Sequence, residues 1–208
     1  MKNHPTFLII RYMMISILIA LFGCASTEPS RFYSLNSLKA QEITQKTIST
    51  DRGVSIALSP VNIPDYLDRP QIVSRTGKNE LFIDEFNRWA GFLGEDITRV
   101  LAENLSILLA QEHITILTWE RTVPIDYRIV VDATRFDVMP DDNVLLKAQW
   151  IIFGKDGKNI LAMRESNFNE HVDGQDYSAR VAAMSRTLES LSREIASEIK
   201  KMKDQRVI

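Results

Sequence analysis

The chain offers few side chains for acid–base or nucleophilic catalysis. It contains three histidines, His4, His113 and His171, and His4 lies in a segment that we expect to be removed. His113 falls at the end of a predicted helix, where a cation interacts favourably with the helix dipole, and His171 falls in a polar strand that we expect to face solvent. The sequence has no Gly-x-Ser-x-Gly, P-loop, Gly-x-Gly-x-x-Gly or His-Glu-x-x-His motif. We therefore expect a protein that is not an enzyme and uses no cofactor.

Three aspartates, Asp137, Asp141 and Asp142, lie close together around Pro140. Carboxylates are ligands that calcium prefers, so a weak calcium site is one interpretation of this cluster. Asp, Asn and Pro also favour turns, and we prefer a plain turn. A zinc site built from cysteines within one chain is excluded because the sequence has a single cysteine, Cys24. We therefore expect no metal site.

Residues 1–23 have the composition of a secretory signal peptide. Lys2 and Arg11 are basic, and the segment contains no acidic residue. The apolar run from Tyr12 to Phe22 is too short for a spanning helix, which needs about 20 apolar residues. A basic start, a short apolar run and a small residue at the end are typical of a secretory signal. The alternative, a buried N-terminal helix, would need a polar outward face that this run lacks.

The end of this segment, Leu21-Phe22-Gly23-Cys24, is similar to the bacterial lipobox, with Leu at −3 and a small residue at −1. The resemblance implies attachment of a diacylglycerol to the Cys24 sulfur, cleavage before Cys24 and acylation of the new amine. Several acyl chains anchor a protein firmly, whereas one anchors it only marginally. The alternative, an unmodified thiol, would be reactive in an oxidising compartment. Ala25 stands where inner-membrane retention usually shows Asp, so we expect the outer membrane, periplasmic face.

The mature chain is expected to consist of a lipidated tether, residues 24–30, and a single periplasmic domain, residues 31–208. The seven tether steps of up to about 3.5 Å each reach about 25 Å, so the domain must lie close to the bilayer. The chain has 25 basic and 27 acidic residues and a formal net charge of −2. Nucleic-acid-binding domains usually show a basic surface, so we expect no nucleic-acid partner.

Hydrophobic periodicity predicts the element order β-β-β-β-α-β-β-β-β-α. The strands are expected at 31–35, 54–63, 71–75, 80–86, 114–119, 127–134, 146–152 and 160–172, and the helices at 95–112 and 177–203. A hairpin is predicted at 76–79, and the apolar stripe of the last helix is assigned to the core. This order favours an α+β fold with a mostly antiparallel sheet and two helices packed on one face.

Four stretches of the chain carry sequence motifs that are specific when they are taken together. They are Ile63–Arg75, Asn79–Leu81, Arg88–Ala90 and Ile97–Leu105. This set resembles the paraquat-inducible protein C family, the lipoprotein auxiliary subunits of MCE-type, ABC-linked transport systems, over most of residues 31–200. The family pattern has Trp-Ala-Glu-Pro-Leu where this chain has Trp89-Ala90-Gly91-Phe92-Leu93, so the Glu-Pro pair is replaced.

The resemblance implies a non-enzymatic, outer-membrane-anchored periplasmic subunit that docks an MCE-protein tube. Lipid would then move between the two membranes, which supports envelope integrity, and other subunits would supply the energy. One alternative is a periplasmic lipid-binding carrier lipoprotein without a fixed MCE partner, which needs an apolar cavity of about 300 Å³ or more. Another is an envelope hydrolase, which needs a convergent polar site. We also expect a homo-oligomer, because closed symmetric assembly suits an adaptor around a tube.

The candidate partner-binding residues are Tyr66, Leu67, Arg69 and Trp89. The first three lie in a segment bounded by prolines, and aromatic and arginine side chains are enriched at interface hot spots. The alternative is that Tyr66 and Leu67 fold back onto the sheet as a plug and that Trp89 is an anchor of the core. The sequence leaves both interpretations open for Tyr66 and Leu67, and for Trp89 we prefer the core.

Overall fold

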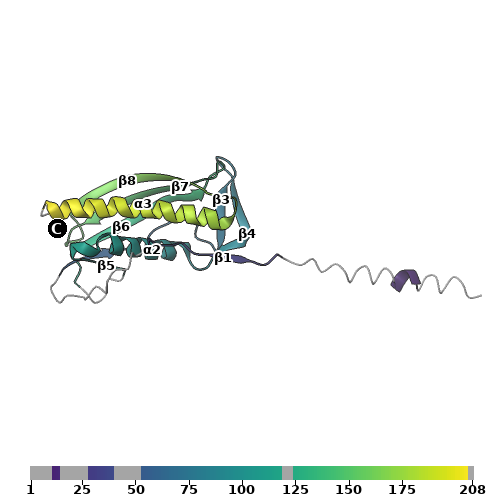
Figure 1. Ribbon diagram of the computed structural model, residues 1–208, viewed down its shortest axis with the longest axis horizontal. Coiled ribbons are helices and arrows are strands. Elements are labelled where there is room, and N and C mark those ends of the chain that lie inside the picture. The colour runs from purple at the N-terminus through teal and green to yellow at the C-terminus, as the bar shows by residue number, and fades with distance from the viewer. Residues whose placement is uncertain (1–10, 15–27, 40–52, 119–123, 206–208) are drawn as a thin grey trace, which may run out of the picture.

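The computed structural model describes residues 11–14, 28–39, 53–118 and 124–205 (Figure 1). Cys24 and most of the predicted signal peptide lie outside these ranges, so acylation at Cys24 stays a prediction. None of the described helices combines the length and the apolar character that crossing a bilayer requires.

The order of helices and strands agrees with the order predicted from periodicity. The elements are β1 (Arg31–Tyr33), β2 (Val54–Leu58), β3 (Gln71–Arg75), β4 (Leu81–Trp89), α2 (Leu93–Leu108), the 3-10 helix η1 (Ala110–Glu112), β5 (Ile114–Leu117), β6 (Tyr127–Val138), β7 (Asn143–Phe153), β8 (Ile160–His171) and α3 (Tyr177–Asp204). The α+β class, the mostly antiparallel sheet and the two helices on one face are therefore confirmed.

The first long helix is shorter than predicted at its C-terminal end. It was expected to run to residue 112, but α2 ends at Leu108 and the chain tightens into η1. His113 follows in the left-handed conformation, with φ of 55°. This conformation cannot continue a right-handed helix, so it turns the chain directly into β5. His113 therefore shapes a helix-to-strand turn, whereas the sequence placed it at the end of the helix.

Strand β6 is the branch point of the sheet. On one edge it pairs antiparallel with β7, which pairs in turn with β8. The opposite edge is shared, because Tyr127–Ile129 pair with β2 and Val138 pairs with Ser74 of β3. One arm continues from β2 to β5, and the other continues from β3 through β4 to β1. The connection between β2 and β3, residues 59–70, therefore runs along the β6 edge between the two arms.

A bulge in β6 decides which side chains face the helices. Ile129, Val131 and Ala133 are buried on the helix-covered face. The register against β7 shifts between Ala133 and Arg135, so after the bulge Phe136 and Val138 occupy that face instead. Asp137, next to them, consequently points to the opposite face, where it is fully buried.

Helices α2 and α3 lie beside each other on one face of the sheet (Figure 1). The apolar stripe of α3, predicted to be core, is buried: Val181, Met184, Leu188, Leu191, Ile195, Ile199 and Met202. Between the helices the buried Asn104 amide donates to Ser192 Oγ at 3.2 Å and accepts from the Leu38 amide at 2.7 Å. Lys203 Nζ donates to Glu112 at 2.6 Å, which fixes the C-terminal end of α3 against η1.

Candidate partner-binding site

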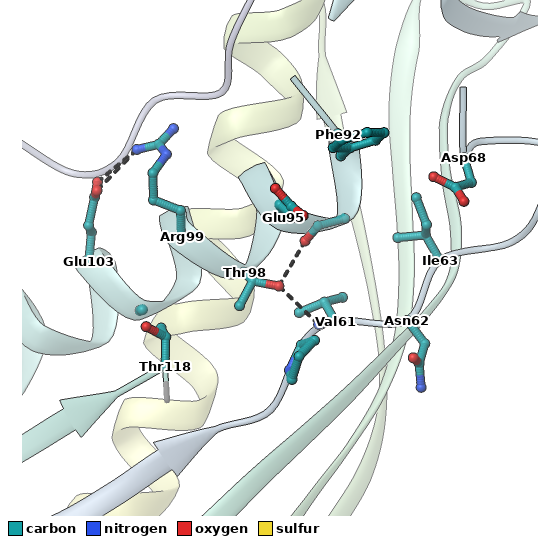
Figure 2. Close-up of a pocket in the computed structure, with 13 residues that line it drawn as sticks. Val61, Asn62, Ile63, Asp68, Phe92, Glu95, Thr98, Arg99, Glu103 and Thr118 are labelled. Atoms are coloured by element: carbon teal, nitrogen blue, oxygen red, sulfur yellow. Dashed lines mark hydrogen bonds and ion pairs between the residues drawn. The ribbon is translucent and has the colours of Figure 1, made fainter. Parts of the chain in front are cut away.

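An open groove of about 780 Å³ lies between the β2–β3 connection and α2 (Figure 2). We call it the α2 groove. It is lined by Pro60, Val61, Asn62, Ile63, Asp68, Phe92, Gly94, Glu95, Thr98, Arg99, Ala102, Glu103 and Thr118. A second hollow of about 530 Å³ shares Ala102, Glu103 and Thr118 with it and extends along α2 to Ile107. Together the two follow most of the length of α2.

The floor of the α2 groove is fixed by contacts between the connection and the start of α2. Thr98 Oγ1 accepts from the Val61 amide at 2.9 Å and donates to the Gly94 carbonyl at 2.7 Å. An added Cβ at Gly94 would lie 3.4 Å from the Val61 oxygen, an ordinary van der Waals distance, so the connection and the helix are in contact here. Asn62 is held on the other side by its backbone bonds to Val131 and Ala133 of β6. The groove is therefore built on backbone that the sheet and helix hold in place.

Arg99 organises the acidic side of the α2 groove. Its guanidinium binds Asp96 at 2.5 Å and Glu103 at 3.0 Å, and donates to the Leu35 carbonyl at 2.8 Å. Burial alone would lower the pKa of Arg99, but the hydrogen bonds and ion pairs with Asp96 and Glu103 raise it above its ordinary value. Arg99 therefore stays charged and holds the segment before residue 40 against α2.

The exposed rim of the α2 groove combines one large aromatic ring with carboxylates. Phe92 is 70% exposed, and Figure 2 shows it near Ile63 and Asp68. Asp68 and Glu95 line the groove together with the Arg99–Glu103 pair, so acidic charge exceeds basic charge. Across the described residues no group of three or more His, Cys, Asp or Glu side chains is placed to hold a metal ion. The arrangement is suited to binding an apolar segment that carries basic side chains.

Tyr66 and Leu67 are directed toward the sheet. The Leu67 side chain is buried in the core, and the Tyr66 hydroxyl donates to Asp137 Oδ1 at 2.8 Å. The chain turns tightly here, since the Leu67 amide donates to the Pro64 carbonyl at 2.9 Å. The geometry corresponds to the plug alternative for these two residues, and a contact between Tyr66 and a partner stays a prediction.

Asp137 is the centre of a buried charged cluster under this plug. Its Oδ2 accepts from Arg75 Nε at 2.8 Å and from Arg135 Nη2 at 3.1 Å. The Arg75 guanidinium also lies 5.7 Å from the centre of the Tyr66 ring. Burial, followed by the hydrogen bond to the Asp137 carboxylate, raises the pKa of Tyr66 to about 12. The cluster pins the connection to the sheet.

The other two candidate residues, Trp89 and Arg69, differ in burial. Trp89 is buried in the core, and its backbone amide donates to the Pro70 carbonyl at 2.7 Å. Arg69 is half-buried, and its Nε has no hydrogen-bond partner within the described part of the chain. Trp89 thus supports the end of the connection from inside. The unpartnered Nε of Arg69 is itself buried, so a contact between Arg69 and a partner stays a prediction.

The aspartates suspected of binding calcium are separated by the structure. Asp137 belongs to the cluster inside β6, and Asp141 accepts from the Asn143 amide side chain at 2.9 Å. Asp142 adopts a φ of 55°, and its amide donates to the Met139 carbonyl at 3.1 Å in the β6–β7 turn. The turn interpretation is therefore the one that the geometry supports.

Sequence reasoning missed the α2 groove, in part because the helix was predicted to begin at residue 95, whereas α2 begins at Leu93. Phe92 occupies the N-cap position of α2 and makes no side-chain capping bond. This position strongly prefers Ser, Thr, Asp or Asn, so an exposed phenylalanine there indicates a role other than capping. Glu95 and Arg99 had no distinctive signal, because charged residues on a helix usually face solvent.

Comparisons with known proteins identify crystal structures of similar architecture. A crystal structure of an uncharacterized protein is similar, with 20% sequence identity and a TM-score of 0.70, covering 83% of this chain and 99% of that one. Protein XCC0632 from Xanthomonas campestris has 15% identity and a TM-score of 0.66, covering 85% and 99%. A PelC dodecamer from Paraburkholderia phytofirmans is more distant, with 12% identity and a TM-score of 0.44, covering 71% and 88%.

No curated protein sequence matches the chain. The sequence model of one family, described as the ABC-type transport auxiliary lipoprotein component, matches residues 33–196. This match spans most of the chain and includes every element that lines the α2 groove. The chain belongs to the family of ABC-type transport auxiliary lipoprotein components.

Proposed function

We propose that this protein is a non-catalytic adaptor that docks the MCE-domain protein of an ABC-linked lipid transport system at the outer membrane. Membership of the auxiliary lipoprotein family supports a transporter partner. The single cysteine, Cys24, supplies the atom that a lipoprotein anchor requires, and the alanine after it supports the outer membrane. Assembly of several copies around one tube also stays a prediction.

The α2 groove is the observation that carries the docking proposal. The α2 groove and the second hollow beside it together follow α2 from Gly94 to Ile107, about 20 Å of helix at 1.5 Å per residue. Phe92 supplies an exposed apolar contact, and Asp68 and Glu95 favour a basic partner segment through charge complementarity. The proposed occupant is an amphipathic segment of the MCE protein with apolar residues flanked by lysine or arginine.

The alternative function, a lipid carrier, has less support from the geometry. The space between the sheet and the helices is filled by large buried side chains, among them Trp150, Phe136, Ile56 and Leu101. The α2 groove is open to solvent and carries carboxylates, whereas a lipid tail needs enclosed apolar walls. We therefore place the carrier second.

The anchoring part of the proposal is tested by intact mass and membrane fractionation of the wild type beside Cys24→Ser. We expect the wild type to lose its first 23 residues, gain acyl mass and fractionate with the outer membrane. Cys24→Ser should lose the acyl mass and the outer-membrane location. An unacylated wild type, or one in the inner membrane, would contradict this part.

The docking part is tested by co-purification of the MCE protein encoded with this chain, from membranes that contain both. Phe92→Glu places a further negative charge at the α2 groove and should lose the MCE protein. Met163→Glu is the matched control, because Met163 is 66% exposed on β8, away from the groove. Equal recovery with both variants would exclude the α2 groove as the docking site.

A further inference from the structure

Three exposed phenylalanines lie on β1 and β4, the paired strands where the chain enters the domain. Phe32 is 65% exposed on β1, and Phe82 and Phe86 are 48% and 36% exposed on β4. Monomer surfaces usually scatter large apolar side chains singly, and a group of them marks an interaction site. We call this group the aromatic end of the domain.

The aromatic end lies next to the predicted tether. Strand β1 pairs parallel with β4, with Phe32 opposite Arg88, and Figure 1 shows both strands at the end of the domain where residues 28–30 enter. Glu28 and Pro29 line a small hollow of about 160 Å³ together with Phe86. The last described residues of the tether therefore lie beside the exposed ring of Phe86.

The outward position of Phe86 is built into β4. The β3–β4 register shifts between Gln71 and Val73, so β4 contains extra residues that β3 does not pair. Within them Asp84 Oδ1 accepts from the backbone amides of Phe86 and Asn87, both at 2.8 Å. Asn87 Oδ1 also accepts from the Tyr33 hydroxyl at 2.9 Å. A bulge held by these bonds turns Phe86 outward instead of into the core.

The length of chain before Glu28 identifies what lies against this surface. Cys24 precedes Glu28 by four residues, which span at most about 14 Å, and precedes Phe32 by eight, at most about 28 Å. If Cys24 carries the acyl chains, as the proposed function requires, their glycerol lies at the surface of the hydrocarbon core. The polar layer of one leaflet is only about 6 Å thick. The bilayer is thus the nearest large surface that the aromatic end can reach.

We propose that the aromatic end is a membrane-contacting surface, in which Phe32, Phe82 and Phe86 insert into the leaflet that holds the lipid anchor. This contact would fix the orientation of the domain, whereas acyl chains on a tether fix only its distance. The α2 groove would then keep a constant height and direction relative to the membrane, which an adaptor for a tube requires.

The charges around the aromatic end favour insertion over electrostatic attraction. Arg31 and Arg88 are the basic neighbours, and Glu28, Asp84 and Glu85 are the acidic ones, with Arg88 paired to Glu85 at 3.6 Å. Acidic groups outnumber basic ones, so the surface has no excess of positive charge for anionic headgroups. The contact is therefore expected on zwitterionic phosphatidylcholine and is expected to be insensitive to salt.

The test uses the acylated full chain in phosphatidylcholine vesicles with single introduced cysteines. Because the Cys24 sulfur is acylated, Phe86→Cys or Phe82→Cys provides the only thiol for an environment-sensitive nitrobenzoxadiazole label. Met163→Cys, exposed on β8, is the control. Each labelled protein is compared in plain vesicles and in vesicles containing nitroxide-labelled lipid, after thermal unfolding has verified its fold.

We expect a blue-shifted emission and about threefold or more quenching by the nitroxide lipid at positions 82 and 86, and water-like emission at position 163. Equal, weak quenching at all three positions would overturn the inference. A blue shift without lipid quenching would also overturn it, because the phenylalanines would then be covered by protein, such as a second copy. Absence of acyl mass would defeat the anchoring proposal as well, whereas an acylated protein with an unquenched label would defeat only this inference.

Discussion

Two arginine–carboxylate clusters lie on either side of the β2–β3 connection, and they differ in exposure. In the inner cluster the Asp137 side chain is 0% exposed, and Arg75 is 17% exposed. In the outer cluster Arg99 and Glu103 are 44% and 43% exposed. The inner carboxylate also binds Tyr66, whereas the outer cluster borders the α2 groove.

The difference separates a structural role from a binding role on neighbouring surfaces. Removing one partner of a buried ion pair leaves an uncompensated charge, whereas an exposed pair contributes little to stability. The inner cluster therefore fixes the connection, and the outer one is available to a partner at small cost to the fold. Substitutions in the two clusters should accordingly affect different measurements.

The largest effect is expected from Asp137→Ala. It leaves Arg75 and Arg135 next to an apolar gap and removes the acceptor of Tyr66, so the free energy of unfolding should fall by about 3 kcal/mol. Urea denaturation measures this change. Asp141→Ala, in the exposed β6–β7 turn, is the control and should stay within about 0.5 kcal/mol. Equal effects of the two variants would contradict the structural role of the inner cluster.

A smaller loss is expected from Tyr66→Phe. The buried Asp137 Oδ1 loses the hydroxyl that donates to it at 2.8 Å, which should lower the free energy of unfolding by about 1 to 2 kcal/mol. Because the hydroxyl faces the sheet, binding of the MCE protein should not change. Unchanged stability together with weakened binding would instead make Tyr66 a direct partner contact.

The stability of the inner cluster should decline at alkaline pH. The pKa of Tyr66 is raised to about 12 from 10.0 by burial and by Asp137. Its stabilising contribution is therefore present below pH 10 and is lost as the pH rises toward 12. Since Tyr66 is only partly buried, solvent screening limits the change to about 1 kcal/mol.

This decline can be assigned by comparing variants. Tyr177 also has a pKa raised to about 12, by burial and by Asp84, so unfolding of the wild type between pH 9 and 12 reports both tyrosines. Tyr66→Phe should remove one part of the decline and leave the part due to Tyr177. An identical pH profile in wild type and variant would contradict the proposed coupling.

The smallest effect on stability is expected from Arg99→Ala. Its ion pairs with Asp96 and Glu103 are partly exposed, so the free energy of unfolding should change by less than about 1 kcal/mol. The groove becomes more acidic, and a basic partner segment should bind more tightly at low salt. Titrations with the MCE protein at two salt concentrations measure this. A loss of several kcal/mol of stability would show that the outer cluster, like the inner one, has a structural role.

Periodicity predicted the order of the elements because it records which face of each segment is buried. The alternation in residues 127–134 and the stripe of residues 181–202 both have a single covered face. The bulge between Ala133 and Arg135 was not predictable in this way, because it depends on pairing with β7. The parallel pairing of β2 with β5 and β6 likewise joins segments more than 50 residues apart.

The site was less predictable than the fold. Tyr66 and Arg69 were selected by residue type, but the partner of Tyr66, Asp137, lies 71 residues away. Leu67 and Trp89 were also selected, and their side chains are buried in the core. Residue type alone does not distinguish an exposed hot spot from a buried plug. The α2 groove requires the connection and the helix to be in place, and the N-cap position and exposure of Phe92 became known only from the structure.

The most direct test of the account is the affinity of the acylated protein for its MCE partner, measured together with stability for Phe92→Glu and Tyr66→Phe. The account predicts that Phe92→Glu weakens binding by about tenfold or more without loss of stability. Tyr66→Phe should lose stability and retain wild-type affinity. Unchanged affinity for Phe92→Glu with weakened affinity for Tyr66→Phe would contradict the account, because the partner would then bind the inner side of the connection.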